Sequence, residues 1–194
     1  KGSPSSVLVL IGFICISLLV LICSLIVVIF LYNLYGGFHS HLGVVFDSGS
    51  SSTKVYAYSW EGDWSDGEQT ITTVNEIATA KSGKPALAEI RGNISEGIRK
   101  HFDPLFEFID KIVPPEKRAK TSVSLGATAG MRALSESNKI LFDQILRETV
   151  SYFAKRPYSV RTKNIRVISG DEEGIFAWYT TNILLSNINP RTKH

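Results

Sequence analysis

The feature that most constrains this chain of 194 residues is a long apolar run near its N-terminus. Residues 7–32 contain no charged side chain, and roughly 20 apolar residues are enough to cross a bilayer as a helix. A buried core helix is usually shorter and carries charge on one edge. A cleaved signal peptide has an apolar region of roughly 7 to 15 residues followed by a small-residue cleavage site. The run therefore predicts a retained transmembrane helix over residues 7–32.

The charges around this run indicate its direction. Lys1 is the only Lys or Arg before Lys54, and basic flanking residues favour the cytosolic side of a membrane. We expect residues 1–6 to form a cytosolic stub and the C-terminal part to lie on the extracellular or lumenal side. Among membranes, the plasma membrane is favoured, although the length of the run separates membranes only weakly.

Several smaller features follow from this topology. Both cysteines, Cys15 and Cys23, lie inside the apolar run, so the remaining chain has neither a disulfide framework nor a cysteine metal site. The Asn93-Ile94-Ser95 sequon predicts N-glycosylation of Asn93 on the lumenal side. Small residues of the run offer limited support for pairing with a second copy and thus for a homo-oligomer; they are Gly12, Ser17 and Ser24.

The charge balance of the remaining chain argues against a nucleic-acid partner. Only Lys1 of the 21 basic residues, and none of the 18 acidic residues, precedes residue 43. The rest is therefore a mixed surface without the dense basic face that nucleic acid requires. About 150 residues suit a single domain.

After a linker at residues 33–42, strand and helix patterns alternate. We expect a hairpin of strands 43–46 and 53–60 joined by loop 48–52, a turn at 61–66 and a strand at 70–77. Helical spacing follows at 87–98 and again from Pro104 to residue 112, before strand 123–125, helix 140–153, strand 165–168 and helix 173–185. This order predicts an α/β fold with a mixed sheet, in which ligands tend to bind at the C-terminal ends of strands.

Three strands end abruptly in small or acidic residues, at 47–53, 126–130 and 169–174. Small side chains let the backbone approach a ligand, and successive N–H groups in a tight turn form a concavity for an anion. Four hydroxyl residues of the first loop would add donors: Ser50, Ser51, Ser52 and Thr53. The first loop is thus typical of a phosphate cradle, although a plain polar hairpin turn would use similar residues.

Charged residues at the same breaks suggest a metal-assisted reaction. Asp47 could orient a divalent cation beside phosphates, or make an ordinary turn hydrogen bond. Arg132 could pair with a carboxylate or a phosphate. Glu172 and Glu173 open a helix, where acidic residues act as caps; a glutamate there could instead deprotonate a water for in-line attack.

Three segments together resemble a known family. The segments "DSGSSSTK" (47–54), "LGATAGMRAL" (125–134) and "ISGDEEGIFAWYTTNILL" (168–185) are similar to the first three apyrase conserved regions of the nucleoside triphosphate diphosphohydrolases. They occur in the family's order, with the apolar run just before the first. The resemblance, over about residues 30 to 186, implies an actin-like (ribonuclease H-like) ATPase fold, with a first lobe at 43–170 and the start of a second at 171–194.

The resemblance also implies individual roles. Asp47 would hold Ca²⁺ or Mg²⁺ through water, Thr128 matches the metal-proximal threonine, and Glu173, rather than Glu172, matches the catalytic base. Trp178 and Arg132 would have supporting structural roles. The phosphates would be surrounded by two loops, which comprise Ser48, Gly49, Ser50, Ser51, Ser52 and Thr53, and then Ala127, Thr128, Ala129 and Gly130.

The implied activity is hydrolysis of nucleoside tri- and diphosphates to the monophosphate and phosphate by a cation-dependent, membrane-anchored apyrase. The fourth and fifth conserved regions have no match in this sequence, so we expect this chain to be inactive or poorly folded alone and to expose part of a hydrophobic interface. Two alternatives stay open: an exopolyphosphatase-like phosphohydrolase of the same fold, and a non-catalytic, nucleotide-binding membrane protein. The preferred nucleotide base and phosphate number are not indicated.

Overall fold

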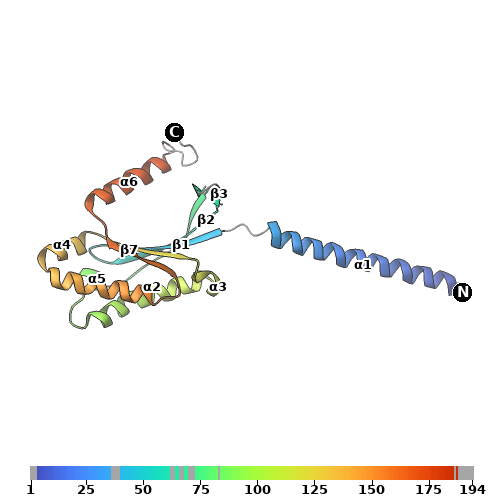
Figure 1. Cartoon of the computed structure of the whole chain (residues 1–194), viewed down its shortest axis with the longest axis horizontal. Helices are drawn as coiled ribbons and strands as arrows, with labels where there is room; N and C mark the ends of the chain where they lie inside the picture. The colour runs from blue at the N-terminus through green and yellow to red at the C-terminus, as the bar shows by residue number, and fades with distance from the viewer. Residues whose placement is uncertain are drawn as a thin grey trace. The chain divides into compact units, whose positions relative to one another are not determined.

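The structure is a computed structural model that describes residues 4–35, 40–61, 64–65, 68–69, 73–82, 84–185 and 187. The chain divides into two compact units, Lys1–His39 and Ser40–His194 (Figure 1). The elements are α1 (Pro4–Tyr35), β1 (Ser40–Ser48), β2 (Thr53–Glu61), β3 (Trp64–Ser65), β4 (Glu68–Gln69), β5 (Thr73–Lys81), η1 (Leu87–Glu89), α2 (Ile94–Ile112), α3 (Pro115–Arg118), β6 (Ser122–Ala127), α4 (Ala129–Ser137), α5 (Lys139–Ala154), β7 (Ser159–Val167) and α6 (Gly170–Leu184).

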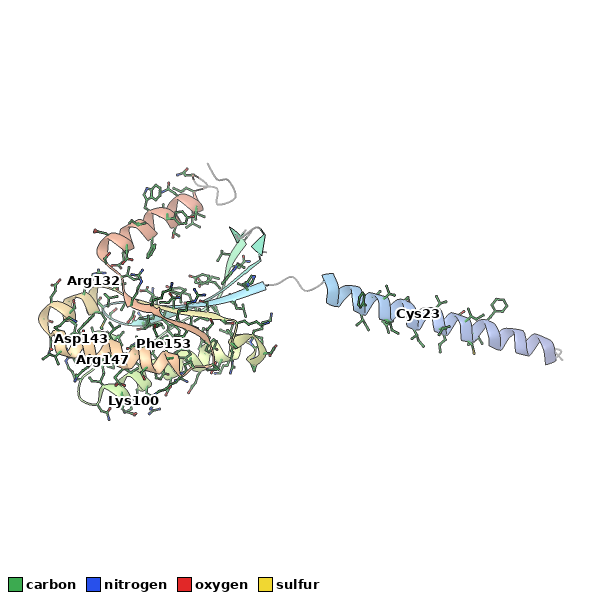
Figure 2. All side chains as sticks on the ribbon, viewed as in Figure 1. Cys23, Lys100, Arg132, Asp143, Arg147 and Phe153 are labelled. Atoms are coloured by element: carbon green, nitrogen blue, oxygen red, sulfur yellow. The ribbon has the colours of Figure 1, made fainter. Side chains whose placement is uncertain are left out.

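The first unit is the single helix α1. Its segment Gly12–Phe30 has a mean hydropathy of 3.3 and is long and apolar enough to cross a membrane. The hydroxyl groups of Ser17 and Ser24 donate to backbone carbonyls of the preceding turn, at 2.9 and 2.8 Å, which satisfies these two polar groups within the helix. Cys15 and Cys23 are free thiols on its exposed surface (Figure 2). Residues 1–3 of the expected stub lie outside the described residues, and residues 4–6 are helical.

The second unit is built on a five-stranded sheet with the order β5-β2-β1-β6-β7. The central strand β1 pairs antiparallel with β2 and parallel with β6, while β2–β5 is antiparallel and β6–β7 is parallel. The expected α/β fold with a mixed sheet is therefore confirmed. The expected hairpin is also present, because Ser48 pairs with Thr53 across the loop. Residues 64–65, expected in a turn, instead pair with residues 68–69 in a separate two-stranded sheet.

The core lies between the sheet and the pair α2 and α5, which cover one side of it while α6 lies on the other (Figure 1). Phe46 of β1 is fully buried at its centre, with its ring centroid 5.0 Å from those of Phe106 and Phe153 and 5.9 Å from that of Phe102. Phe153 points from α5 into this layer (Figure 2). Because side chains alternate along a strand, the neighbours Val45 and Asp47 face away from these helices and are exposed.

The prediction of a helix start at Pro104 was wrong, because α2 runs unbroken through this residue. Pro104 has no N–H group to donate to the carbonyl of Lys100, four residues earlier in the helix. Both residues are exposed. The opposite face of α2 buries apolar side chains on both sides of the proline, and this burial outweighs a cost of about 3 kcal/mol for the missing hydrogen bond and the ring. These buried side chains are Ile98, Phe102, Leu105, Phe106 and Ile109.

Other bounds differ where periodicity is a weak signal. Residues 87–98, expected as one helix, contain the short η1 and then α2, because Gly92 adopts a φ of 73° and Asn93 caps α2. Strand β7 begins at Ser159 rather than residue 165, since an edge strand needs only backbone bonds to its neighbour and can carry exposed polar side chains. Ile140, expected on the buried face of α5, is 76% exposed in the first turn of that helix.

Candidate functional site

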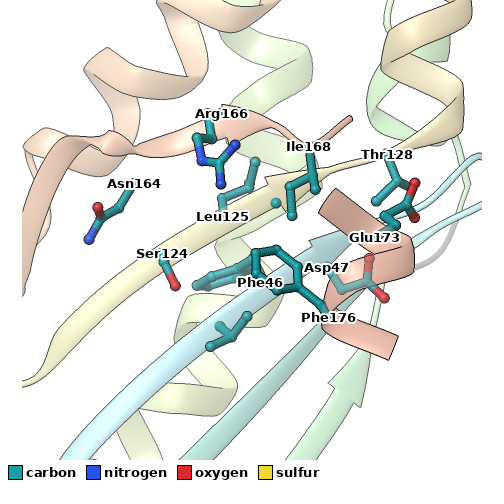
Figure 3. A pocket seen from close by; sticks show the side chains of 12 residues that line it. Phe46, Asp47, Ser124, Leu125, Thr128, Asn164, Arg166, Ile168, Glu173 and Phe176 are labelled. Carbon is teal, nitrogen blue, oxygen red and sulfur yellow. The ribbon is translucent and has the colours of Figure 1, made fainter. Parts of the chain in front are cut away.

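A cavity of about 580 Å³ opens where β1, β6 and β7 meet α6 (Figure 3). This is the C-terminal end of the parallel strands, where ligands of such sheets tend to bind. Its polar lining combines two carboxylates, two hydroxyl groups, an amide and a guanidinium group from separate parts of the chain. The lining residues are Val45, Phe46, Asp47, Ser124, Leu125, Gly126, Thr128, Asn164, Arg166, Ile168, Glu173 and Phe176.

The end of β1 divides the predicted phosphate loop between two faces of the sheet. Asp47 is exposed and lines the cavity, whereas Ser48, the next residue, is 1% exposed. The alternation of side chains along a strand produces this separation. Asp47 can therefore meet a ligand directly, while the Ser48 side chain faces the helical layer.

The hydroxyl groups at the two ends of the loop are bound inside the protein. Ser48 Oγ lies 2.9 Å from Thr53 Oγ1, and Thr53 Oγ1 lies 2.7 Å from His101 Nε2. His101 Nδ1 in turn lies 3.0 Å from the carbonyl oxygen of Pro85. Ser48, Thr53 and His101 are all buried, so these two predicted phosphate ligands present backbone rather than hydroxyl groups to a ligand.

The loop between them is short and tightly closed. The Gly49 amide donates to the Ser52 carbonyl at 3.0 Å, and the Thr53 amide donates to Ser82 Oγ at 2.9 Å. Ser50 and Ser51 are exposed, whereas Ser52 is 9% exposed. Within the part of the chain that the structure describes, the amide groups of residues 50–52 have no hydrogen-bond partner. They are available donors in a small-residue turn.

The second predicted loop lies against the first. The Thr128 amide donates to the Ser48 carbonyl at 3.0 Å, and Thr128 is the N-cap of α4 without a side-chain cap bond. A Cβ atom on Gly130 would approach the Ser50 Cα to 3.1 Å, closer than most real contacts, so a side chain there would require the two loops to move slightly apart. The uncapped first amide groups of α4 thus lie beside the hairpin loop, an arrangement suited to an anion.

The two glutamates at the start of α6 have different surroundings. Glu172 accepts from the Ser169 amide and forms an ion pair with Arg166 at 2.8 Å, while Ser169 Oγ accepts from the Glu172 amide. The hydrogen bond from Arg166, followed by that from the Ser169 backbone, lowers the pKa of Glu172 to about 2. Glu172 is therefore the capping glutamate of α6.

Glu173 instead lines the cavity together with Asp47 and Thr128 (Figure 3). Its carboxylate accepts from Arg132 Nη1 at 2.5 Å, and the same nitrogen donates to the Ile168 carbonyl at 2.6 Å. Arg132 comes from α4 (Figure 2), so a side chain of the second predicted loop orients an acid of the third. Of the two partners proposed for Arg132 from sequence, the carboxylate is present.

The remaining predicted residues are more dispersed. Ala127 is buried at the end of β6, and Ala129 is exposed at the first position of α4. Trp178, for which a supporting role was expected, is 62% exposed on α6. Asn93 is exposed, and its Oδ1 accepts from the Glu96 amide at 3.1 Å as the N-cap of α2.

Sequence reasoning missed several residues near the site. Asn164, Arg166 and Phe176 line the cavity. His101 forms a hydrogen bond with Thr53 at the end of the hairpin loop. The signal for His101 was its place in the buried helical face between Ile98 and Phe102, where a polar residue needs a partner. The signal for Arg166 was its position directly after the buried Ile165 in a strand.

The oxygen ligands at the cavity fit a hard divalent cation. Ca²⁺ and Mg²⁺ take carboxylate, hydroxyl and water oxygens, and Mg²⁺ often uses only one or two carboxylates plus phosphate oxygens. Asp47 and Thr128 supply a carboxylate and a hydroxyl oxygen of this kind. Among the described residues, no group of three or more His, Cys, Asp or Glu side chains is placed to hold a metal ion.

Comparison with known proteins defines the class. The model of the GDA1/CD39 (nucleoside phosphatase) family matches residues 38–194. This chain therefore belongs to the GDA1/CD39 family, and the expected resemblance is confirmed.

Individual relatives have names that agree with this family. Ectonucleoside triphosphate diphosphohydrolase 3 of Homo sapiens is 32% identical over 75% of this chain, ectonucleoside triphosphate diphosphohydrolase 1 of Bos taurus is 33% identical over 77%, and probable apyrase 1 of Oryza sativa subsp. japonica is 32% identical over 78%. The matches cover only 26%, 28% and 29% of these relatives. The chain thus spans little more than a quarter of their length.

A solved structure supports the fold. The crystal structure of nucleoside triphosphate hydrolases from Neospora caninum aligns with a TM-score of 0.53 and 17% sequence identity, over 77% of this chain and 32% of that one. At this identity the likeness concerns the fold alone. Together with the mixed sheet it confirms the α/β, actin-like class that the sequence indicated.

Proposed function

We propose that this chain supplies the first half of an apyrase site, which hydrolyses nucleoside tri- and diphosphates to the monophosphate and phosphate with Ca²⁺ or Mg²⁺. The observation that carries the proposal is the meeting of Asp47, Thr128 and Glu173, which come from three sequence segments, at one cavity. Family membership agrees with nucleotide phosphates as substrates.

The terminal phosphates would bind between the hairpin loop and α4. The unpartnered amide groups of residues 50–52 and the first amide groups of α4 would donate to phosphate oxygens, helped by the positive end of that helix. Gly130 keeps the two backbones close enough to share one anion. Ser50 and Ser51 would add their exposed hydroxyl groups.

Asp47 and Thr128 would hold the divalent cation through water molecules. The bound cation supplies positive charge that neutralises the charge developing on the transferred phosphoryl group. Asp47 lies near the end of β1, so the backbone pairing of the sheet fixes the position of its main chain. Arg166 adds positive charge to the same cavity.

Glu173 would act as the general base. Its carboxylate would orient and deprotonate the water that attacks the phosphorus atom in line with the leaving oxygen. Arg132 would keep this carboxylate aimed at the cavity through its 2.5 Å hydrogen bond. The bonds of Glu172 to Ser169 and Arg166, which engage it as the cap of α6, support Glu173 rather than Glu172 in this role.

The surroundings of the site form part of the proposal. We infer that α1 anchors the chain in a membrane, favoured as the plasma membrane, with the second unit on the extracellular or lumenal side. Asn93 is exposed there and would accept a glycan. The lobe boundaries at residues 43–170 and 171–194 and a homo-oligomer through α1 stay predictions. The match covers about a quarter of the length of the first relative, so the activity of the whole site belongs to the proposal.

The first test is phosphate release from ATP, ADP and polyphosphate by membranes that carry the chain, with Ca²⁺, Mg²⁺ or chelator. Any release from nucleotides should depend on the cation, fall by about 10²-fold or more in Glu173→Gln and change little in Glu172→Gln. Equal release by both variants would contradict Glu173 as the base, and release from polyphosphate alone would favour the exopolyphosphatase-like alternative.

A binding measurement covers the case in which this chain is inactive without further residues. We expect cation-dependent binding of ADP that Asp47→Asn weakens and Glu173→Gln leaves largely intact. Absence of release together with such binding would support a half-site. Absence of both release and binding would contradict the proposed function for this chain.

A further inference from the structure

The buried side chain of His101 is unusual for its place in the fold. It lies on the apolar face of α2 with 6% exposure, and its ring meets that of Phe102 edge to face at a centroid distance of 4.8 Å. Burial lowers the pKa of this imidazole, and the hydrogen bond to Pro85 opposes that effect. A phenylalanine or leucine would fill the same face without a polar group to satisfy.

The partners of His101 determine its tautomer. The Pro85 carbonyl oxygen, 3.0 Å from Nδ1, can only accept, so Nδ1 must carry a proton. In a neutral imidazole Nε2 is then an acceptor. Thr53, at 2.7 Å, must donate its hydroxyl proton to Nε2. The Thr53 oxygen is left to accept from the hydroxyl group of Ser48 at 2.9 Å.

This chain of hydrogen bonds has one direction and joins the two ends of the loop at residues 49–52. Ser48 is the last residue of β1 and Thr53 is the first of β2, and they are paired across the hairpin. The Ser48 carbonyl also accepts from the Thr128 amide, which ties the start of α4 to the same point. A change at His101 is therefore transmitted to both loops at the cavity.

We propose that His101 is a positioning residue, whose neutral Nδ1–H imidazole accepts the Thr53 hydroxyl and thereby holds the loop at residues 49–52 in its phosphate-binding shape. The inference rests on the proposed function only in naming phosphate as the ligand of the loop. The shape of the loop itself can be measured without nucleotide. His101 itself would touch neither substrate nor metal, because it lies on the helical side of the sheet, opposite Asp47.

The proposal is tested on the full chain in detergent micelles. The unmodified protein, labelled with ¹⁵N at histidine, reports the His101 tautomer directly by NMR. Amide hydrogen exchange of Gly49 and Thr128, which donate to the Ser52 and Ser48 carbonyls, reports the loop. ADP with Mg²⁺ is the binding probe. Unfolding by denaturant gives global stability for every variant.

Two pairs of variants separate the hydrogen bond from packing. Thr53→Val keeps the volume and removes the hydroxyl, whereas Thr53→Ser keeps the hydroxyl. His101→Gln places an acceptor near the position of Nε2, whereas His101→Asn places its amide nearer Nδ1. Thr149→Val is the matched control, because Thr149 is buried like Thr53, at 1% against 0% exposure. Its hydroxyl donates to the Ile145 carbonyl within α5 at 2.7 Å.

We expect the Nδ1–H tautomer, and amide exchange at Gly49 and Thr128 that rises about tenfold in Thr53→Val and His101→Asn, the effect of one lost hydrogen bond. Thr53→Ser and His101→Gln should stay close to the unmodified protein, and Thr149→Val should lose stability without faster loop exchange. ADP binding should weaken in the same order as exchange rises.

Two results would overturn the inference. One is the Nε2–H tautomer in the unmodified protein, which decides the matter even if a variant does not fold. The other is equal loop exchange in Thr53→Val and Thr149→Val at equal stability. If the unmodified chain binds no ADP, the proposed function fails, while the tautomer and exchange data still decide the role of His101.

Discussion

The hairpin loop that follows Asp47 and the helix α6 are held in place by different kinds of interaction. The hairpin loop is joined to the core through buried hydroxyl groups, His101 and the strand pairing of β1 with β2. Helix α6 has no buried residue, and two ion pairs, Arg132–Glu173 and Arg166–Glu172, connect its start to the rest of the unit. Exposed ion pairs contribute little, about 0–1 kcal/mol each. The phosphate side is therefore built into the fold, whereas the position of the proposed base depends on weak, exposed contacts.

The largest expected contrast is between an apolar ring of the core and one of α6. Phe46→Ala should lower the free energy of unfolding by about 3–5 kcal/mol, because it removes the ring at the centre of the aromatic cluster. Phe176→Ala, at a side chain that is 50% exposed, should change it by no more than about 0.5 kcal/mol. Denaturant unfolding of the full chain in detergent measures both, and similar losses would show that α6 is packed in solution.

A pH effect should distinguish the buried side. Burial lowers the pKa of His101 from its ordinary value of 6.5 in the folded state, so the unfolded chain binds more protons just below pH 6.5. Stability should then be full above that pH, fall as the pH decreases through it, and level off below the folded pKa. His101→Gln should lack this slope, and an unchanged slope in the variant would assign it to another group.

Loss of Arg132 should act locally. Arg132→Met removes the hydrogen bonds to Glu173 and to the Ile168 carbonyl. The side chains of Arg132 and Glu173 are 32% and 40% exposed, so the free energy of unfolding should change by about 1 kcal/mol or less. Amide exchange at the start of α6 should nevertheless increase, because the helix loses a main contact. Arg132→Lys, which keeps the charge, should have an intermediate effect, and slower exchange than in the unmodified chain would contradict this reasoning.

The smallest effect is expected from the cap of α6. The folded pKa of Glu172 is lowered to about 2 from an ordinary value of 4.5, so its contribution is present above pH 4.5 and lost as the pH falls through about 2. Because the pair with Arg166 is exposed, salt should reduce the effect. Amide exchange of residues 170–174 in Glu172→Gln and in high salt measures it, and a salt-independent effect would indicate a role beyond this ion pair.

The sequence was a good guide wherever a signal is local and strong. The apolar run, the alternating strand after the first loop and the abrupt ends of β1 and β6 predicted α1, the hairpin and the site segments at about the right positions. It failed at Pro104 and at residues 159–164. There, burial of the opposite helix face and backbone pairing to β6 outweighed the local preference.

Within the site, the sequence identified which residues gather but not which way they point. It grouped Ser48 and Thr53 with Asp47 as ligands, although their side chains lie on opposite faces of the sheet. It favoured Glu173 over Glu172 through the resemblance. The structure adds a physical reason, the capping bonds of Glu172, without testing the catalytic role itself.

Amino-acid order alone determined the class of this protein: an apolar helix, an α/β unit with a mixed sheet, and three small-residue breaks that mark one family. These are properties of neighbouring residues and of their spacing. Only the tertiary structure decided that His101 holds the loop through Thr53 and that Arg132 aims Glu173 at the cavity. Such contacts join residues far apart in the chain. They exist because the packing of α2 against the sheet and of α4 against α5 brings these side chains within hydrogen-bond distance.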